Sequence, residues 1–136
     1  MKFHRNILDI DAEAEVNRIA QCVREQVMGV LRRRGAIVGI SGGIDSSVVA
    51  ALCARSLGKE KVLGLFMPEH HSSDDALRLG QLLSTSLGIE TVLENLAPAL
   101  EGAKCYTRQE EAVRMVVPEY GPGWKCKLVL PSILDS

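Results

Sequence analysis

The sequence predicts an α/β fold built on a partial doubly wound parallel sheet of three to four strands with flanking helices. Segments with apolar residues at helical spacing alternate with short continuous apolar runs, a pattern typical of parallel strands joined by right-handed crossovers. Two expected helices end in near copies, Ser56-Leu57-Gly58 and Ser86-Leu87-Gly88, which indicates a structural repeat. A loop rich in glycine and serine also joins the first expected strand to a helix. A chain of 136 residues is long enough for a single domain, 1–136.

The first expected helix begins near residue 12 and ends at Gly35, a residue that takes the left-handed capping conformation at little cost. Residues 32–34 are arginines in its expected last turn, where cations favour the negative end of the helix dipole. We interpret them as a solvated helix end rather than a phosphate patch. Residues 36–40 predict a strand that is buried on both faces. The apolar face of the helix is expected to consist of Val16, Ile19, Ala20, Val23, Val27, Val30 and Leu31.

Two further helix and strand units follow. A second helix is expected from about Asp45 to Gly58, and residues 62–67 predict another buried strand, ended by Pro68. The spacing of Ser72 and Asp75 resembles a capping box and opens a third helix. Residues 89–93 predict a third, weaker strand. The inward residues are expected to be Val48, Val49, Leu52, Cys53 and Leu57 in the second helix, and Ala76, Leu79, Gly80, Leu83 and Leu87 in the third.

The last forty residues carry weaker signals. Residues 109–117 are a candidate helix with sparse apolar residues, and residues 128–130 resemble the start of a strand. Three parallel strands are few for a doubly wound sheet, which typically has about five or six. We therefore expect an incomplete domain whose exposed apolar surface is buried against a second chain, or whose tail after about residue 100 is disordered.

Composition narrows the class of function. Hydrophobic residues make up 46% of the chain, the formal net charge is −1 and aromatic residues make up only 4%. The chain therefore has enough apolar residues for a core but no overall attraction to nucleic acid or an anionic membrane. No apolar run is long enough to span a bilayer. We expect small-molecule partners, no nucleic acid and no membrane.

The four cysteines are expected to be reduced thiols in a cytoplasmic protein. None of them has the paired spacing of a zinc or redox motif. The first residues also hold no continuous apolar run of a secretory leader. The cysteines are Cys22, Cys53, Cys105 and Cys126.

The loop that follows the first expected strand carries the chemistry. Parallel sheets bind ligands at the carboxyl ends of their strands. Gly42 and Gly43 let an anion approach the backbone, and the N–H groups of residues 43–47 would point into the loop at the positive end of a helix dipole. Hydroxyl groups come from Ser41, Ser46 and Ser47. Asp45 would repel a phosphate unless a cation intervened, and Mg²⁺ favours one or two carboxylates together with substrate phosphates.

Two other nucleotide-binding loops do not fit. The P-loop requires a Gly-Lys pair, and no lysine lies between Gly39 and Ser47. The dinucleotide fingerprint requires Gly-x-Gly-x-x-Gly, a spacing that Gly39, Gly42 and Gly43 do not have. A tight turn with Asp45 as a helix cap would not require two glycines, three serines and an acid together.

Ser41-Gly42-Gly43-Ile44-Asp45-Ser46 resembles the Ser-Gly-Gly-x-Asp-Ser loop of the N-type ATP pyrophosphatases, or PP-loop enzymes. That superfamily includes NAD synthetases, GMP synthetases, asparagine synthetases and several tRNA-modifying enzymes. Residues 39–50 and 62–69 are most similar to NAD synthetase, and the resemblance covers about residues 12–95, an N-terminal portion. It implies a Rossmann-like fold of the adenine nucleotide alpha-hydrolase kind.

The resemblance also implies a reaction. The carboxylate of nicotinic acid adenine dinucleotide (deamido-NAD) attacks the α-phosphorus of ATP, pyrophosphate leaves, and ammonia displaces AMP to give the amide. Without a glutaminase-type domain, the implied ligase is of the ammonia-dependent type and homodimeric. The implied Mg²⁺ ligand is Asp45, and no catalytic side chain is assigned. The implied nucleotide-binding residues are Gly39, Ser41, Gly42, Gly43, Ile44, Asp45, Ser46, Ser47 and, against the adenine, Met67.

Other interpretations stay open at this point. NAD synthetases continue well past this length, and their later strands supply a second metal carboxylate and most of the dinucleotide site. We therefore expect the chain alone to be inactive. The alternatives are another PP-loop adenylating enzyme, GMP synthetase-like or tRNA-modifying, and a truncated ATP-binding module without turnover. His70 and His71 are interpreted as a solvated loop, and Trp124 as a packing residue.

Overall fold

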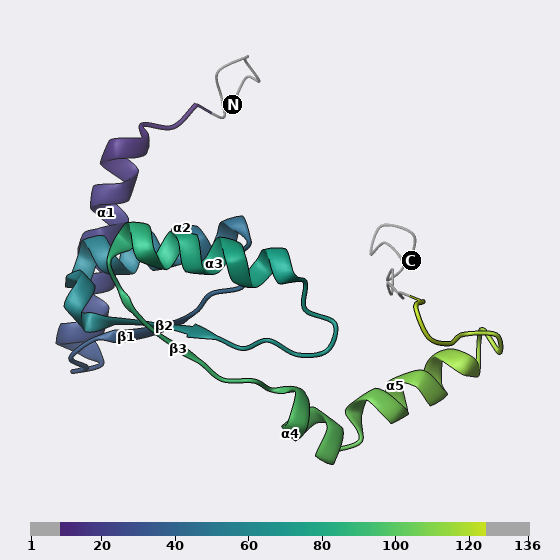
Figure 1. The fold of residues 1–136 in the computed structure, drawn as a ribbon. Coiled ribbons are helices and arrows are strands. Elements are labelled where there is room, and N and C mark those ends of the chain that lie inside the picture. The colour runs from purple at the N-terminus through teal and green to yellow at the C-terminus, as the bar shows by residue number, and fades with distance from the viewer. Residues whose placement is uncertain (1–8, 125–136) are drawn as a thin grey trace. The chain divides into compact units, whose positions relative to one another are not determined.

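A computed structural model of the chain describes residues 9–124. They divide into two compact units at residue 97. The first unit contains three parallel strands and the helices between them (Figure 1). In chain order its elements are α1 (Ala12–Arg24), the π-helical turn η1 (Glu25–Val30), β1 (Ala36–Gly39), α2 (Ile44–Leu57), the 3₁₀ turn η2 (Lys59–Lys61), β2 (Val62–Phe66), α3 (Asp74–Leu87) and β3 (Glu90–Leu93).

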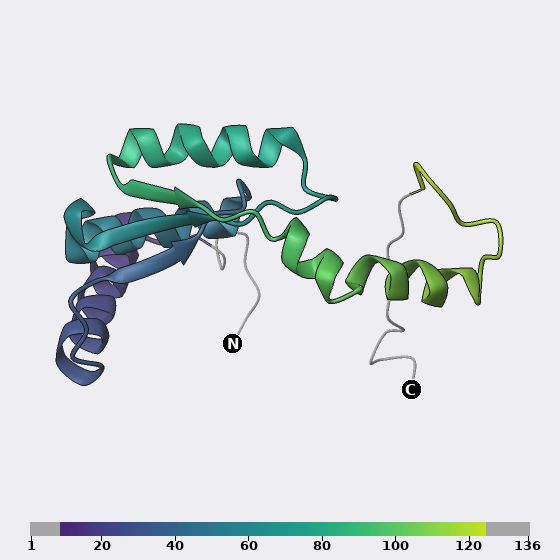
Figure 2. The ribbon, with the colours of Figure 1, turned by 60° about the horizontal axis from the view of Figure 1, so that its bottom comes forward.

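The sheet has the strand order β1-β2-β3, with Val38 paired to Gly64 and Gly64 paired to Thr91. Helices α2 and α3 connect successive strands and lie on the same side of the sheet (Figures 1 and 2). Helix α1 packs against α2. The predicted alternation of helices and parallel strands is confirmed.

The core lies between the sheet and these helices. Val38, Phe66 and Ile89 are buried on the covered face, and Ala50 and Leu57 reach them from α2. Each large apolar side chain buried in this way contributes about 1.5–3 kcal/mol. Helix α3 approaches β2 at Gly80, where a Cβ would lie 2.7 Å from Cε1 of Phe66. The absence of a side chain at Gly80 therefore sets the distance between helix and sheet.

The prediction that residues 36–40 form a strand buried on both faces is wrong, because Ile37 is 70% exposed. Buried and half-buried residues alternate along β2, and Val92 of β3 is 43% exposed. Within α2, Val48 and Val49 are also exposed rather than directed inward, and Leu79 of α3 is 42% exposed. A doubly wound sheet would require helices on the second face.

The first helix is shorter than predicted. It ends at Arg24 and passes into the π-helical turn, so Arg32–Arg34 lie beyond the helix rather than in its last turn. Arg32, not Gly35, takes a left-handed φ of 49°. Gly35 is required for a different reason, because a Cβ there would lie 2.3 Å from the carbonyl oxygen of Lys61. Val30 and Leu31 are exposed instead of completing the apolar face.

The residues at which α2 and α3 begin and end match the prediction only in part. Gly58 and Gly88 follow α2 and α3 with φ of 93° and 66°. The N-cap of α3 is Ser73 rather than Ser72, and its Oγ accepts a hydrogen bond from the N–H of Ala76 at 3.2 Å. Ser72 instead accepts from the N–H of Glu69 at 3.0 Å.

The second unit contains α4 (Ala97–Gly102) and α5 (Cys105–Arg114). The predicted helix at 109–117 therefore begins and ends earlier, and the alternative of a disordered tail does not hold for these helical residues. The rings of Trp124 and Tyr120 meet edge to face, with centroids 6.2 Å apart. The candidate strand at 128–130 lies outside the described residues. Within the described part of the chain, no helix is long and apolar enough to cross a membrane.

Candidate functional site

The glycine- and serine-rich loop lies at the carboxyl end of β1, where the chain turns into α2. The N–H of Ile40 donates to the carbonyl oxygen of Leu65 at 2.9 Å and holds the start of the loop against β2. Gly43 is the N-cap of α2 in an extended conformation. The loop therefore runs from the carboxyl end of β1, an edge strand of the described sheet, into the first turn of a helix, and the predicted strand-to-helix connection is confirmed.

Gly42 has a φ of 77°, which L-residues with a side chain rarely adopt. A Cβ at this position would lie 2.3 Å from the carbonyl oxygen of Ala76 in the first turn of α3. Backbone conformation and space therefore both demand glycine here. The loop after β1 and the first turn of α3 touch at this point.

The serine hydroxyl groups bond within the loop. The Ser46 Oγ accepts from the N–H of Ser41 at 3.2 Å, lies 3.1 Å from the Ser41 Oγ and donates to the carbonyl oxygen of Gly43 at 3.1 Å. The Ser47 Oγ donates to the same carbonyl oxygen at 2.7 Å. The N–H of Gly43 donates to the Ser41 Oγ at 3.4 Å. These bonds close the loop on itself.

The first backbone N–H groups of α2 are available to a ligand. The first helical bond runs from the N–H of Ser47 to the carbonyl oxygen of Gly43, so the preceding N–H groups have no partner within the helix. Among the described residues nothing accepts from the N–H groups of Ile44, Asp45 or Ser46. Together with the positive end of the helix dipole, they make the loop suited to an anion.

Asp45 is exposed in the first turn of α2. In the part of the chain that the structure describes, no group of three or more histidine, cysteine, aspartate or glutamate side chains could hold a metal ion. Asp45 is the carboxylate that α2 itself brings to the loop. A cation held there would need its remaining oxygen ligands from elsewhere.

Met67 follows β2 and lies beside Gly39, where a Cβ would be 3.2 Å from the Met67 Cε. Next to them is a hollow of about 140 Å³ with apolar walls and a few hydroxyl groups. The structure thus brings Met67 and Ser41 to one edge of the sheet. The hollow is lined by Ile40, Ser41, Phe66, Met67, Pro68, Ser72, Ser73, Ala76 and Leu77.

The sequence interpretation had not included the connection from β2 to α3 in the site. Ser72, Ser73, Ala76 and Leu77 line the hollow beside Ser41. A signal was present, because this connection follows β2 just as the loop follows β1, and parallel strands bring their carboxyl ends to one edge. His70 and His71 are exposed in this connection, in agreement with a solvated loop.

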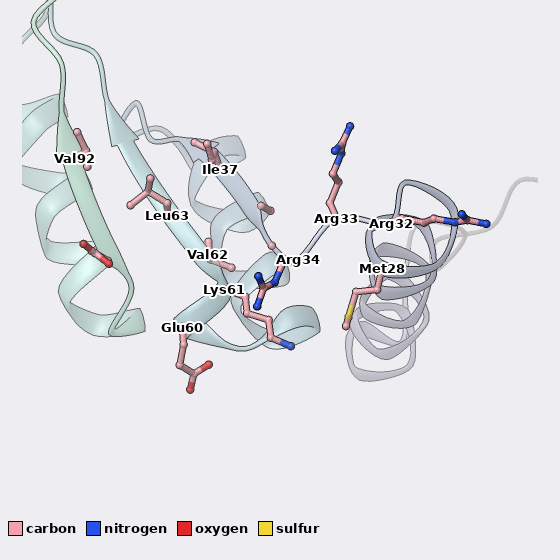
Figure 3. Close-up of a pocket in the computed structure, with 13 residues that line it drawn as sticks. Met28, Arg32, Arg33, Arg34, Ile37, Glu60, Lys61, Val62, Leu63 and Val92 are labelled. Carbon is pink, nitrogen blue, oxygen red and sulfur yellow. The ribbon is translucent and has the colours of Figure 1, made fainter.

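A separate, open hollow of about 960 Å³ lies at the amino ends of the strands (Figure 3). Ile37, Leu63 and Val92 line it from the uncovered face of the sheet. Arg32 and Arg33 extend away from the strands (Figure 3) and are exposed. None of the predicted site residues lines this hollow, and we therefore place the candidate site at the carboxyl edge.

Known proteins are similar to this chain in sequence and in fold. The sequence model of the NAD synthase family matches residues 15–118. The NH(3)-dependent NAD(+) synthetase of Mesorhizobium japonicum is 61% identical over 130 residues, which are 96% of this chain and 41% of the relative. The relative of the same name in Rhizobium rhizogenes is 48% identical over 127 residues, 93% of this chain and 38% of the relative.

A solved structure agrees with the sequence relatives. The NH3-dependent NAD synthetase of Campylobacter jejuni superimposes with a TM-score of 0.65 and 27% identity over 80% of this chain and 50% of that chain. This chain spans about two fifths of the length of the curated relatives it matches. A family match over most of the sequence, joined to the shared parallel-sheet fold, establishes that this chain belongs to the NAD synthase family.

Proposed function

We propose that this protein acts as an ATP-dependent NAD synthetase. It would amidate nicotinic acid adenine dinucleotide with ammonia through an acyl-adenylate and release AMP and pyrophosphate. The observation that carries the proposal is the loop at residues 41–46, whose helical N–H groups at 44–46 are unpartnered among the described residues. Membership of a family whose relatives are named NH(3)-dependent NAD(+) synthetases supports this reaction.

The loop would hold the β- and γ-phosphates of ATP. Negative charge builds on pyrophosphate as it leaves, and N–H groups already fixed in direction stabilise such charge without reorganising. The N–H groups of Ile44, Asp45 and Ser46 are fixed by the start of α2. Gly39, Gly42 and Gly43 would let the phosphates approach the backbone.

Asp45 fits a magnesium site that the nucleotide completes. Mg²⁺ binds one or two carboxylates together with substrate phosphates rather than an all-protein cage. Asp45 is an exposed carboxylate in the same helical turn as the free N–H groups. A bound Mg²⁺ would offset the repulsion between Asp45 and the phosphates and neutralise charge on the leaving group.

The hollow beside Met67 would take the adenine. Its volume of about 140 Å³ and apolar walls suit a flat ring, and Ser41 in its lining places it next to the phosphate loop. Met67 is 44% exposed, so it can still gain contacts from a ligand. The side chain would lie against the base.

The remaining parts of the active site would come from outside this chain. The relatives are more than twice as long as the matched segment, and among the described residues no group of three or more histidine, cysteine, aspartate or glutamate side chains could hold a metal ion. We therefore propose that this chain alone binds ATP without turnover. We also propose a homodimer, supported by the exposed apolar side chains of Ile37 and Val92 on the uncovered face.

The proposed location is the cytoplasm. The described cysteines, Cys22, Cys53 and Cys105, are free thiols, which suits a reducing compartment. The partners would be ATP, deamido-NAD and ammonia, with no nucleic acid and no membrane.

One incubation, joined to a binding measurement, tests the proposed ATP site and the proposed inactivity of this chain. The purified chain is mixed with ATP, Mg²⁺, an ammonium salt and deamido-NAD, AMP and NAD are quantified by chromatography, and ATP binding is measured by calorimetry. We expect ATP binding without AMP, and AMP and NAD from the complete Mesorhizobium relative under the same conditions. AMP from this chain would refute its proposed inactivity, and absence of ATP binding would refute the proposed site.

A further inference from the structure

A further hollow, of about 590 Å³, lies between α1 and the last turn of α2. Residues of α1 and of the start of η1 form most of its wall, and Arg55 of α2 forms the rest. Arg55 follows Asp45 by ten positions in α2, a distance of about 15 Å along a helix. The hollow is therefore separate from the loop after β1. Its lining residues are Asn17, Ala20, Gln21, Arg24, Glu25 and Arg55.

Two arginine side chains in this hollow are oriented by uncharged oxygen atoms. The Nε of Arg24 donates to the carbonyl oxygen of Ser56 at 2.8 Å. The Nη2 of Arg55 donates to the Oδ1 of Asn17 at 2.8 Å. Each bond joins α1 to α2. A guanidinium group has five N–H donors, so most donors of both arginines remain for a ligand.

No acidic side chain neutralises these two arginines. Arg78 forms an ion pair with Asp75 at 3.0 Å, whereas among the described residues Arg24 and Arg55 have only the two bonds to uncharged oxygens. Glu25 also lines the hollow, and its Oε1 accepts from a glutamine side chain of α1 at 2.8 Å. With two guanidinium groups and one carboxylate in its lining, the hollow keeps a positive charge.

The places at which the two arginines are held favour a ligand with two anionic groups. Arg24 follows Asn17 by seven positions in α1, which is two turns or about 10 Å along the helix. The guanidinium group of Arg55 is bonded to Asn17, so the two cations are held about two turns apart. Arginine binds phosphate oxygens through parallel N–H bonds. A single phosphate would satisfy one arginine, whereas a diphosphate has a phosphate group for each.

We propose that the hollow between α1 and α2 is a second anion site, in which Arg24 and Arg55 bind the two phosphate groups of one diphosphate. The ligand is free pyrophosphate or the end of a nucleoside diphosphate, because both present the same phosphate oxygens. Ser56 and Asn17 already orient the arginines, so little side-chain freedom is lost on binding. The proposal does not rest on the proposed function, because the second anion site lies outside the loop after β1.

Titration of the unaltered chain, followed by the NMR signals of backbone amides, tests the second anion site directly. Without Mg²⁺ and at about 0.15 M salt, where long-range attraction is screened, pyrophosphate should shift the signals of Ala20, Gln21 and Ser56 along a saturable curve. Inorganic phosphate should bind there at least about fivefold more weakly, since it cannot engage both arginines at once. The signals of residues 41–47 report binding at the loop separately. Absence of a saturable shift at Ala20, Gln21 and Ser56, or equal affinity for the two anions, would overturn the proposal.

Substitution of either arginine should weaken this site alone. Arg24→Gln and Arg55→Gln should each lower the affinity for pyrophosphate by about tenfold, the usual worth of a hydrogen bond to a charged group, and leave the shifts of residues 41–47 unchanged. Arg55→Lys keeps the charge but not the planar fork, so it should restore only part of the affinity. Unchanged affinity in both glutamine variants would refute the assignment of Arg24 and Arg55 as ligands.

Arg78→Gln is the matched control. It removes one positive charge from α3, where Arg78 is paired with Asp75, and should leave the affinity unchanged. An equal loss in this variant would mean that the anion responds only to net charge, and the proposal would fail. Arg24→Gln also removes a bond between α1 and α2, so the amide signals of β2 verify folding, and Arg55→Gln repeats the test from the other helix.

ADP distinguishes the two sources of the diphosphate group. Shifts of Ala20, Gln21 and Ser56 with ADP, at an affinity similar to that of pyrophosphate, would assign the second anion site to a nucleoside diphosphate. Shifts with pyrophosphate alone would assign it to the free anion.

Discussion

The carbonyl oxygen of Ala76 occupies the space that a side chain at Gly42 would need, because a Cβ at Gly42 would lie 2.3 Å from it. The first turn of α3 therefore lies directly against the loop after β1. A side chain at position 42 would have to displace one of these two elements. The shape of the candidate phosphate site depends on the second helix as well as on its own residues.

Gly42→Ala is expected to lower both stability and ATP affinity. The left-handed φ of 77° at this position costs a non-glycine residue about 1–2 kcal/mol, and the clash with Ala76 adds to it. We expect a loss of roughly 2 kcal/mol or more in urea unfolding and at least about a tenfold weaker ATP affinity by calorimetry. Gly43→Ala is the control for stability alone, since its φ is −84° and its nearest neighbour would be 3.4 Å away. Equal losses of stability in the two variants would contradict the role of the Ala76 contact.

Gly80→Ala should destabilise the core. A Cβ at Gly80 would lie 2.7 Å from Phe66 and 3.2 Å from Ile40, and overpacking of this kind costs about 1–3 kcal/mol. Gly29→Ala offers a matched comparison in a helical segment, because no atom lies within 4 Å of a Cβ there. It should leave the free energy of unfolding unchanged or raise it slightly. A thermal melt of both variants decides the point.

The fold could be predicted because helical spacing and short apolar runs are local signals, and Gly58 and Gly88 end their helices as expected. The burial of individual residues could not be predicted, because it depends on which face of the sheet the crossover helices cover. Val38 is 7% exposed and its neighbour Ile37 is 70% exposed, although both belong to the same apolar run. The apolar run at residues 36–40 does not indicate that both crossover helices lie on the same side of the sheet.

The glycines and serines of the sequence locate the candidate loop, but they do not predict the hydrogen bonds within it. The sequence predicts that the hydroxyl group of Ser46 contacts phosphate, but it does not predict that the Ser46 Oγ accepts the N–H of Ser41 and lies 3.1 Å from the carbonyl oxygen of Gly43 in the free chain. The bond from the N–H of Ser41 to the Ser46 Oγ spans the turn at Gly42, and Gly42 lies against Ala76. That contact joins residues from two different helix and strand units, and no local pattern encodes it.

Asp45→Asn should change the affinity for Mg²⁺·ATP and the affinity for metal-free ATP in different ways. Without a metal ion the carboxylate repels the phosphates, whereas a Mg²⁺ ion between the two groups lets the carboxylate strengthen phosphate binding. We expect weaker binding of Mg²⁺·ATP and equal or tighter binding of ATP in EDTA, both measured by calorimetry. Stability should fall by no more than about 1 kcal/mol, the worth of an acid near a helix N-terminus. A parallel loss of affinity with and without Mg²⁺ would exclude Asp45 as a metal ligand.

Met67→Ala should weaken the binding of ATP but not the binding of pyrophosphate. Met67 lines the hollow proposed for the adenine, and pyrophosphate has no base to fill it. Removing the side chain should cost about 1 kcal/mol in ATP affinity, equivalent to roughly fivefold. Competition between pyrophosphate and a fluorescent ATP analogue measures both ligands in one assay. If both affinities fell together, Met67 would instead be shaping the phosphate loop.

The cysteines should differ in reactivity with pH. Burial raises the pKa of the Cys53 thiol above its ordinary value, whereas Cys22 and Cys105 are exposed. Because the thiolate is the nucleophile, iodoacetamide at pH 8 should label Cys22 and Cys105 well before Cys53, as read by peptide mass spectrometry.

The raised pKa of Cys53 also makes the free energy of unfolding depend on pH. A pKa raised in the folded state favours folding fully below the unfolded pKa, and this contribution is lost as the pH rises through the folded value. The free energy of unfolding should therefore decline on the alkaline side of pH 9, and Cys53→Ala should reduce that decline.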